Sequence, residues 1–113
     1  MPSTFNTLFV CAKNQWRSPT AAAVYRNDAR INVQSAGLRK QSPQVLSARL
    51  LEWADIVMVM ENKHASRIRD LYRSMPELPE IIVLDIPDDY VFMDPALIEI
   101  IKEAVEPILE EQH

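Results

Sequence analysis

Short apolar runs alternate with amphipathic stretches along the chain. The apolar runs are rich in β-branched residues and predict strands at 5–10, 31–34, 56–60 and 81–84. Apolar residues at helical spacing predict helices at 19–28, 45–53, 62–73 and in a last segment that starts after Asp94-Pro95. Pro107 lies in that last segment, where we expect it to kink or weaken the helix. Strands that alternate with helices predict an α/β fold, a doubly wound parallel sheet with right-handed crossovers.

This fold class predicts where polar side chains would meet. In a parallel sheet the ligand lies beyond the carboxyl ends of the strands. Cys11 follows the first predicted strand, Ser35 ends the second and Asp85 follows the fourth. We therefore expect all three at one edge of the sheet.

The stretch after the first strand carries the strongest chemical signal. Cys11 is the only cysteine, Arg17 follows six residues later, and Ser18-Pro19 predicts a helix start because serine caps helices and proline suits their first turn. Backbone N–H groups at a helix start and a planar guanidinium together suit an anion, and the same field favours a nucleophilic thiolate. A lone cysteine after a strand is more often a buried core residue. The combination of features favours a catalytic role here.

Composition narrows the function classes. The 113 residues, 48% of them hydrophobic, predict one domain over residues 1–113. The net charge of −4 implies no general attraction to nucleic acid or a membrane surface. One cysteine excludes an internal disulfide and fits a cytoplasmic location, and the N-terminus does not resemble a signal peptide. The two histidines lie far apart, so we expect no metal site. The oligomeric state stays open.

The pattern of Cys11, Arg17, Ser18 and Pro19 after a first strand resembles the low-molecular-weight protein tyrosine phosphatases. Three further stretches resemble segments of that family, the last less closely: Val33–Gly37, Ala54–Met60 and Asp85–Tyr90. The resemblance implies a four-stranded parallel sheet of order 2-1-3-4 with helices on both faces. It also implies hydrolysis of a phosphate monoester through a cysteinyl-phosphate, without metal or other cofactor.

The resemblance assigns roles to the loop residues. The phosphate would be held by Arg17 and the backbone of a loop made of Ala12, Lys13, Asn14, Gln15, Trp16, Arg17 and Ser18. Ser18 would donate its hydroxyl to the Cys11 sulfur, and Ser35 would hydrogen-bond to Asn14. Asn14 is the residue of the loop best able to adopt the left-handed conformation. Lys13 is a departure, because the family usually has glycine there.

The general acid has more than one candidate. Asp85, Asp88 and Asp89 lie close together, and at least one of them is expected to be a solvated turn residue. The family's acid directly precedes a proline, whereas here Ile86 does. We favour Asp85 because it follows the fourth strand, and keep Asp88 as the alternative. Asp94 also precedes a proline, but we interpret it as a helix cap.

Aromatic residues are candidates for the pocket walls. Trp16 is either a core residue or a wall of the pocket mouth, where its face would stack on a phenyl ring. Tyr90 and Phe92 are the other candidates. A deep aromatic pocket would select phosphotyrosine, and the expected substrate is a phosphorylated protein or a small phosphate ester. We interpret the basic run over 63–73 as a solvated helix face.

Two other functions stay open. Arsenate reductases share this loop, but this chain has no second cysteine and would need an external thiol. A phosphoryl-binding module or degenerate phosphatase is suggested by Lys13, by the loop without glycine and by the displaced aspartate. The thiol at Cys11 argues against a module that only binds.

Overall fold

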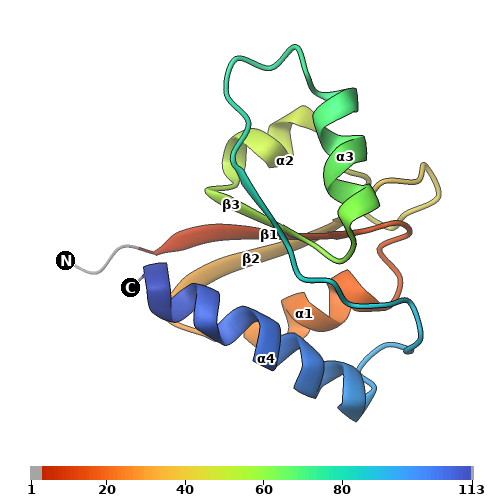
Figure 1. The fold of residues 1–113 in the computed structure, drawn as a ribbon, viewed down its shortest axis with the longest axis vertical. Coiled ribbons are helices and arrows are strands. Elements are labelled where there is room, and N and C mark those ends of the chain that lie inside the picture. Colours follow the sequence, from red (N-terminus) through yellow and green to blue (C-terminus); the bar gives the residue numbers. More distant parts are fainter. Residues whose placement is uncertain (1–3, 113) are drawn as a thin grey trace.

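The computed structural model describes residues 4–112. Eight elements alternate between strand and helix: β1 (Phe5–Cys11), α1 (Arg17–Tyr25), β2 (Ile31–Gly37), α2 (Ala48–Trp53), β3 (Ile56–Val59), α3 (Asn62–Leu71), β4 (Glu80–Val83) and α4 (Pro95–Gln112). The strands form one parallel sheet of order β2-β1-β3-β4 (Figure 1), which confirms the predicted order.

The strand register places the carboxyl ends of the strands side by side. Cys11, the last residue of β1, lies opposite Gly37, the last residue of β2. On the other side of β1, Val10 lies opposite Val59 of β3, which in turn lies opposite Val83 of β4. The loops that follow all four strands therefore open at one edge of the sheet, as expected for a doubly wound fold.

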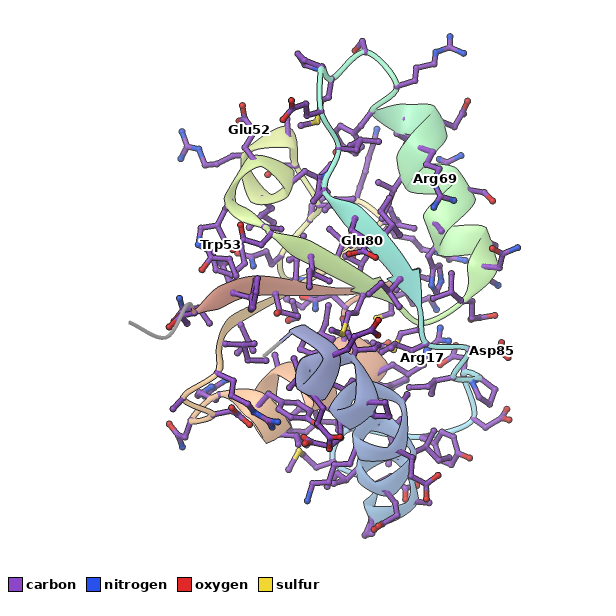
Figure 2. All side chains as sticks on the ribbon, turned by 60° about the vertical axis from the view of Figure 1, so that its left-hand side comes forward. Arg17, Glu52, Trp53, Arg69, Glu80 and Asp85 are labelled. Carbon is purple, nitrogen blue, oxygen red and sulfur yellow. The ribbon has the colours of Figure 1, made fainter. Side chains whose placement is uncertain are left out.

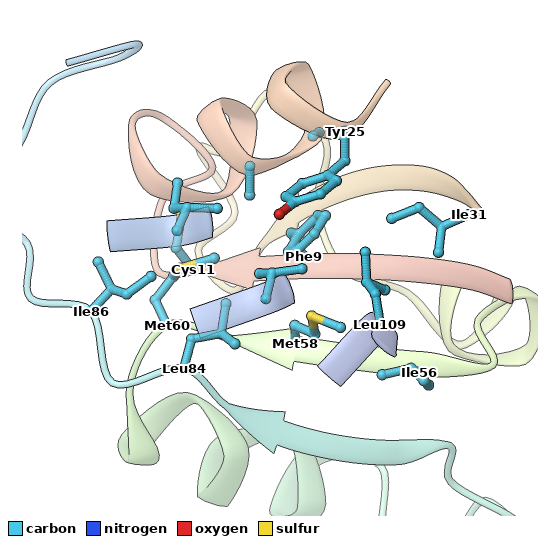
Figure 3. Close-up of a cluster of buried hydrophobic side chains, with 14 of the residues drawn as sticks. Phe9, Cys11, Tyr25, Ile31, Ile56, Met58, Met60, Leu84, Ile86 and Leu109 are labelled. Carbon is cyan, nitrogen blue, oxygen red and sulfur yellow. The ribbon is translucent and has the colours of Figure 1, made fainter. Parts of the chain in front are cut away.

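Helices cover both faces of the sheet, as predicted (Figure 1). Because side chains alternate along β1, Phe9 and Cys11 point into the cluster under α1 and α4, while Leu8 and Val10 point into the cluster under α2 and α3. Figure 3 shows the first cluster, in which the rings of Phe9 and Tyr25 stack with centroids 6.4 Å apart. Cys11 lies at the end of this packed layer, so its position depends on the core.

Several element bounds differ from the predicted ones. Helix α1 begins at Arg17, before Ser18-Pro19, and no side chain caps it at Trp16. Strand β2 extends to Gly37, since it pairs with β1 along its whole length. Helix α2 begins only at Ala48, because the two residues before Ser47 pair with Gly37 through a bridge and a backbone hydrogen bond of 2.8 Å.

The last helix begins where it was predicted to begin, and Pro107 does not end it. The Asp94 carboxylate accepts a hydrogen bond of 2.9 Å from the Ala96 N–H, as expected of a cap. The helix continues through Pro107 to Gln112. Val105 and Leu109, on either side of Pro107, are buried in the core cluster, and this packing stabilises the helix across the proline.

Two findings bear on membranes and metals. Within residues 4–112, no helix has the length and apolar character that a membrane span requires. The same part of the chain contains no group of three or more His, Cys, Asp or Glu side chains arranged to hold a metal ion. The start of the N-terminal segment, judged above not to be a signal peptide, lies outside the described residues.

Candidate active site

The loop between β1 and α1 carries Cys11 at one end and Arg17 at the other. Asn14 has φ of 54°, so it adopts the left-handed conformation expected of it. Lys13 does not have positive φ, which explains why the chain needs no glycine there. Within the loop, the left-handed turn therefore lies at Asn14.

The side chain of Asn14 holds this turn in place. Its Nδ2 donates to Ser18 Oγ at 3.0 Å and to Ser35 Oγ at 2.9 Å. Its Oδ1 accepts the Gln44 N–H at 3.2 Å. The bond between Asn14 and Ser35 that the resemblance implied is thus present. It joins the loop to β2 and to the segment that follows, and fixes an otherwise unfavourable backbone.

Ser18 is oriented toward the cysteine. Its Oγ lies 3.0 Å from Cys11 Sγ, and both side chains are buried. Because Ser18 Oγ accepts from Asn14, its own proton is available for the Cys11 sulfur or for the Ala36 carbonyl, which is farther away at 3.4 Å. The shorter contact favours the sulfur as the acceptor.

Gly37, the only glycine of the chain, is required by close packing behind the loop. A Cβ at this position would lie 2.0 Å from Ser42 Oγ and 2.8 Å from the Asn14 backbone nitrogen. The residues that follow are tied to the end of β1 by bonds from the Leu38 and Arg39 N–H groups to the carbonyls of Cys11 and Ala12. A side chain at Gly37 would therefore displace Ser42 or the backbone of the loop between β1 and α1.

Arg17 is a buried cation with two hydrogen-bond partners and a longer ion pair to Asp88. Its side chain is 3% exposed, and its Nη1 donates to Glu61 Oε2 at 2.6 Å and to the Ile86 carbonyl at 2.8 Å. The bond from Arg17 lowers the pKa of Glu61. These two bonds use one corner of the guanidinium and hold its plane, so the remaining N–H groups stay available to an anion.

Glu61 was missed by the sequence analysis. It lies 44 residues from Arg17, in the short turn between β3 and α3, at the carboxyl edge of the sheet. A carboxylate right after a central buried strand is the signal that would have identified it.

His64 is buried, although the sequence analysis assigned it to a solvated helix face over 63–73. Its side chain is 2% exposed, and its Nδ1 accepts the Glu61 N–H at 3.1 Å at the start of α3. Burial, and then the nearby Arg17 cation, lower the pKa of His64 to about 4. The imidazole is therefore neutral at pH 7. With Nδ1 as the acceptor, its proton lies on Nε2, which has no hydrogen-bond partner among residues 4–112.

The two candidate acids lie in different places. Asp88 lines the pocket above Cys11, and its Oδ1 lies 3.6 Å from Arg17 Nε. Asp85 is exposed and is not among the residues that line the pocket, although Figure 2 shows it at the same end of the sheet as Arg17. Its φ of 58° turns the chain just before Ile86, whose carbonyl meets Arg17. Of the two, Asp88 is the one that lines the pocket together with Cys11 and Arg17.

The pocket has a volume of about 260 Å³ and opens over Cys11 and Arg17. Trp16 lines it and is 36% exposed, so it is a wall of the mouth rather than a core residue. Tyr90 and Phe92, also predicted as walls, are not among the lining residues. Tyr90 packs against the core under α1 and α4, and Phe92 is exposed. The other predicted loop residues that line the pocket are Ala12, Lys13 and Gln15.

Known structures share this arrangement of strands and helices. The tyrosine phosphatase Wzb from Escherichia coli K30, in complex with phosphate, superposes with a TM-score of 0.76, at 17% identity over 98% of this chain and 100% of that one. The arginine phosphatase YwlE from Geobacillus stearothermophilus gives 0.73, at 21% identity over 96% and 92% of the two chains. A YwlE mutant with a phosphorylated active-site serine gives 0.71, at 20% identity over 94% of each chain.

The chain has the fold of the low-molecular-weight protein tyrosine phosphatases. No protein-family model matches the sequence, and no curated protein matches it. The likeness to this fold is therefore carried by the three-dimensional structure together with the short loop motif around Cys11.

Proposed function

We propose that this chain is a cysteine-dependent phosphate monoester hydrolase, and most specifically a protein tyrosine phosphatase. The observation that carries the proposal is one constellation: a buried Cys11 hydrogen-bonded to Ser18, beside a buried Arg17 at the start of α1. A pure binding site would need the guanidinium and the backbone N–H groups, but not the thiol.

In the first step, the Cys11 thiolate attacks phosphorus in line with the ester oxygen. The S–P bond forms while the P–O bond to the leaving group breaks. Arg17 and the loop N–H groups bind the other phosphate oxygens, and because these dipoles are already oriented, they stabilise the transition state without rearrangement. Asp88 donates a proton to the leaving oxygen, a role supported by its place in the pocket.

In the second step, water attacks the phosphorus of the cysteinyl-phosphate. Asp88 accepts a proton from this water, the S–P bond breaks, and inorganic phosphate leaves. The Ser18 hydroxyl donates to the departing sulfur, which carries negative charge again. The phosphorylated active-site serine of the YwlE mutant supports a phosphoryl group on the residue that occupies the nucleophile's place.

Phosphotyrosine is the preferred substrate because Trp16 offers an aromatic wall at the mouth of the pocket. Phosphoarginine is a second candidate, a phosphoramidate in which the S–P bond would form while a P–N bond breaks. YwlE is named an arginine phosphatase, and this pocket carries the carboxylate of Asp88, which suits a guanidinium leaving group. Paired peptides that differ only in phosphotyrosine or phosphoarginine distinguish the two. The preferred substrate is the one with the higher kcat/KM.

The hydrolase proposal is tested with para-nitrophenyl phosphate. We expect turnover by the wild type and none above background by Cys11→Ser, while the variant still binds inorganic phosphate because Arg17 and the loop remain. Wild-type phosphate binding without turnover would establish the phosphoryl-binding module instead. Reduction of arsenate with an added thiol, without ester hydrolysis, would establish the arsenate reductase.

The single cysteine supports the cytoplasm as the proposed location.

A further inference from the structure

Two hollows adjoin the catalytic pocket on the side formed by α3 and the segment after β2. The larger, of about 610 Å³, shares Ala12, Arg39 and Lys63 with the pocket. The smaller, of about 410 Å³, shares Lys13, Gln15 and Arg39 with it. Both are therefore continuous with the place where the phosphate would bind.

The charge of these hollows is opposite to that of the chain. The chain has 16 acidic and 12 basic residues, yet neither hollow is lined by an acidic residue. They are lined by five exposed cations: Lys13, Arg39, Lys40, Lys63 and Arg67. Within residues 4–112, only Lys63 among these has an ion pair, at 3.8 Å from Glu61. We call the surface lined by these five residues the basic groove.

The fold places these cations precisely relative to the nucleophile. The Arg39 N–H donates to the Ala12 carbonyl at 2.9 Å, so the segment that carries Arg39 and Lys40 is fixed to the catalytic loop. Lys63 and Arg67 lie four residues apart on α3 and therefore share one face of that helix. Two separate segments thus direct positive charge into one groove beside the pocket.

The segment after β4 is acidic and reaches the pocket through Asp88. Asp88 lines the pocket, and Asp85 and Asp89 lie exposed in the same segment after β4. The pocket is therefore lined both by cations of the basic groove and by the Asp88 carboxylate of the acidic segment. Such a mixed lining favours a substrate whose charge is also unequal on its two sides.

We propose that the basic groove binds acidic residues on one side of the phosphorylated residue in a protein substrate. This rests on the proposed function, because it names the kind of substrate that the same site takes. A peptide fits better than a small phosphate ester for two reasons. The larger hollow exceeds the phosphate pocket in volume, and its lining includes Leu38 and Leu71, which offer apolar contact to a chain that crosses it.

The experiment compares phosphotyrosine peptides of one length and differing charge. One has two aspartates before the phosphotyrosine, one has them after it, and one has alanines on both sides. We expect one of the acidic peptides to exceed the alanine peptide in kcat/KM by about tenfold at low salt, since several exposed pairs each contribute modestly. The preference should shrink as salt is raised, because screening weakens exposed charge pairs.

A matched pair of variants tests the groove itself. Arg67→Glu reverses a charge in the groove, whereas Arg69→Glu reverses one on the same helix, α3 (Figure 2), at a residue that lines neither hollow. We expect Arg67→Glu to reduce the ratio of acidic to alanine peptide at least threefold, and Arg69→Glu to leave it unchanged. The ratio is informative because a general loss of activity or folding lowers both values alike.

Binding separates this proposal from the catalytic one. The same peptides, labelled with a fluorophore, are titrated with Cys11→Ser and followed by anisotropy. If an acidic peptide binds more tightly than the alanine peptide but the wild type turns over neither, the proposal of the groove stands and the proposal of a hydrolase is overturned. Equal values for acidic and alanine peptides, or a ratio that Arg67→Glu leaves intact, would overturn the groove. Tighter binding of a 5′-phosphorylated oligonucleotide than of any acidic peptide would also overturn it.

Discussion

Protonation of His64 should destabilise the fold at mildly acidic pH. The His64 side chain is 2% exposed, and its Nδ1 accepts the Glu61 N–H at the start of α3. A protonated imidazole cannot accept there, and it would be buried near Arg17. The pKa of His64 is accordingly about 4 in the folded chain, against 6.5 as its ordinary value.

The direction and size of the change in the free energy of unfolding follow from these two pKa values. Between pH 6.5 and about 4 the unfolded chain binds the proton more readily, so the free energy of unfolding falls as the pH is lowered through this range. The contribution of His64 is complete above pH 6.5 and lost at about pH 4 and below. At about 1.4 kcal/mol per pH unit, the total is about 3 kcal/mol, of which about 2 kcal/mol is lost by pH 5.

The assay compares the wild type with His64→Gln, which keeps an acceptor for the Glu61 N–H but does not titrate. Urea unfolding is followed by tryptophan fluorescence at pH 7.5, 6 and 5. We expect the wild type to lose about 2 kcal/mol more than the variant over this range. His113 is present in both proteins, so its effect cancels. An equal loss of unfolding free energy in the two proteins would refute the reasoning. So would an NMR titration of His64 with a midpoint near 6.5.

Three further predictions concern the site. Glu61→Ala should lower kcat/KM for para-nitrophenyl phosphate about tenfold or more, because Arg17 loses a charge-assisted bond worth ~1.5–3 kcal/mol; an unchanged value would show that Glu61 does not position Arg17. Asp88→Asn should slow phosphotyrosine about 10²-fold or more and para-nitrophenyl phosphate far less, because only the poorer leaving group needs the proton, and the same pattern in Asp85→Asn would move the acid there. Gly37→Ala should cost ~1–3 kcal/mol in chemical unfolding, and a change within experimental error would contradict the close packing around Gly37.

The sequence by itself determined the fold class and the loop that carries Cys11 and Arg17. Alternation of apolar runs with amphipathic stretches was enough for a doubly wound parallel sheet, because right-handed crossovers leave few arrangements, whereas the strand order followed from the family resemblance. The left-handed turn at Asn14 was also predictable, since it is the residue of the loop whose side chain tolerates that conformation. These features depend on neighbours in the chain, whose geometry the residue types constrain directly.

Only the tertiary structure decided which distant residues complete the site. Glu61 meets Arg17 across 44 residues, and the choice between Asp88 and Asp85 depends on the turn before Ile86. His64 looked like part of a charged helix face, yet the sheet beneath α3 and the contact with Glu61 bury it. Local patterns show that a helix has an exposed face, but not which of its residues lie against the strands. Burial and ion pairing arise from atoms brought together by packing, and spacing along the chain does not record those distances.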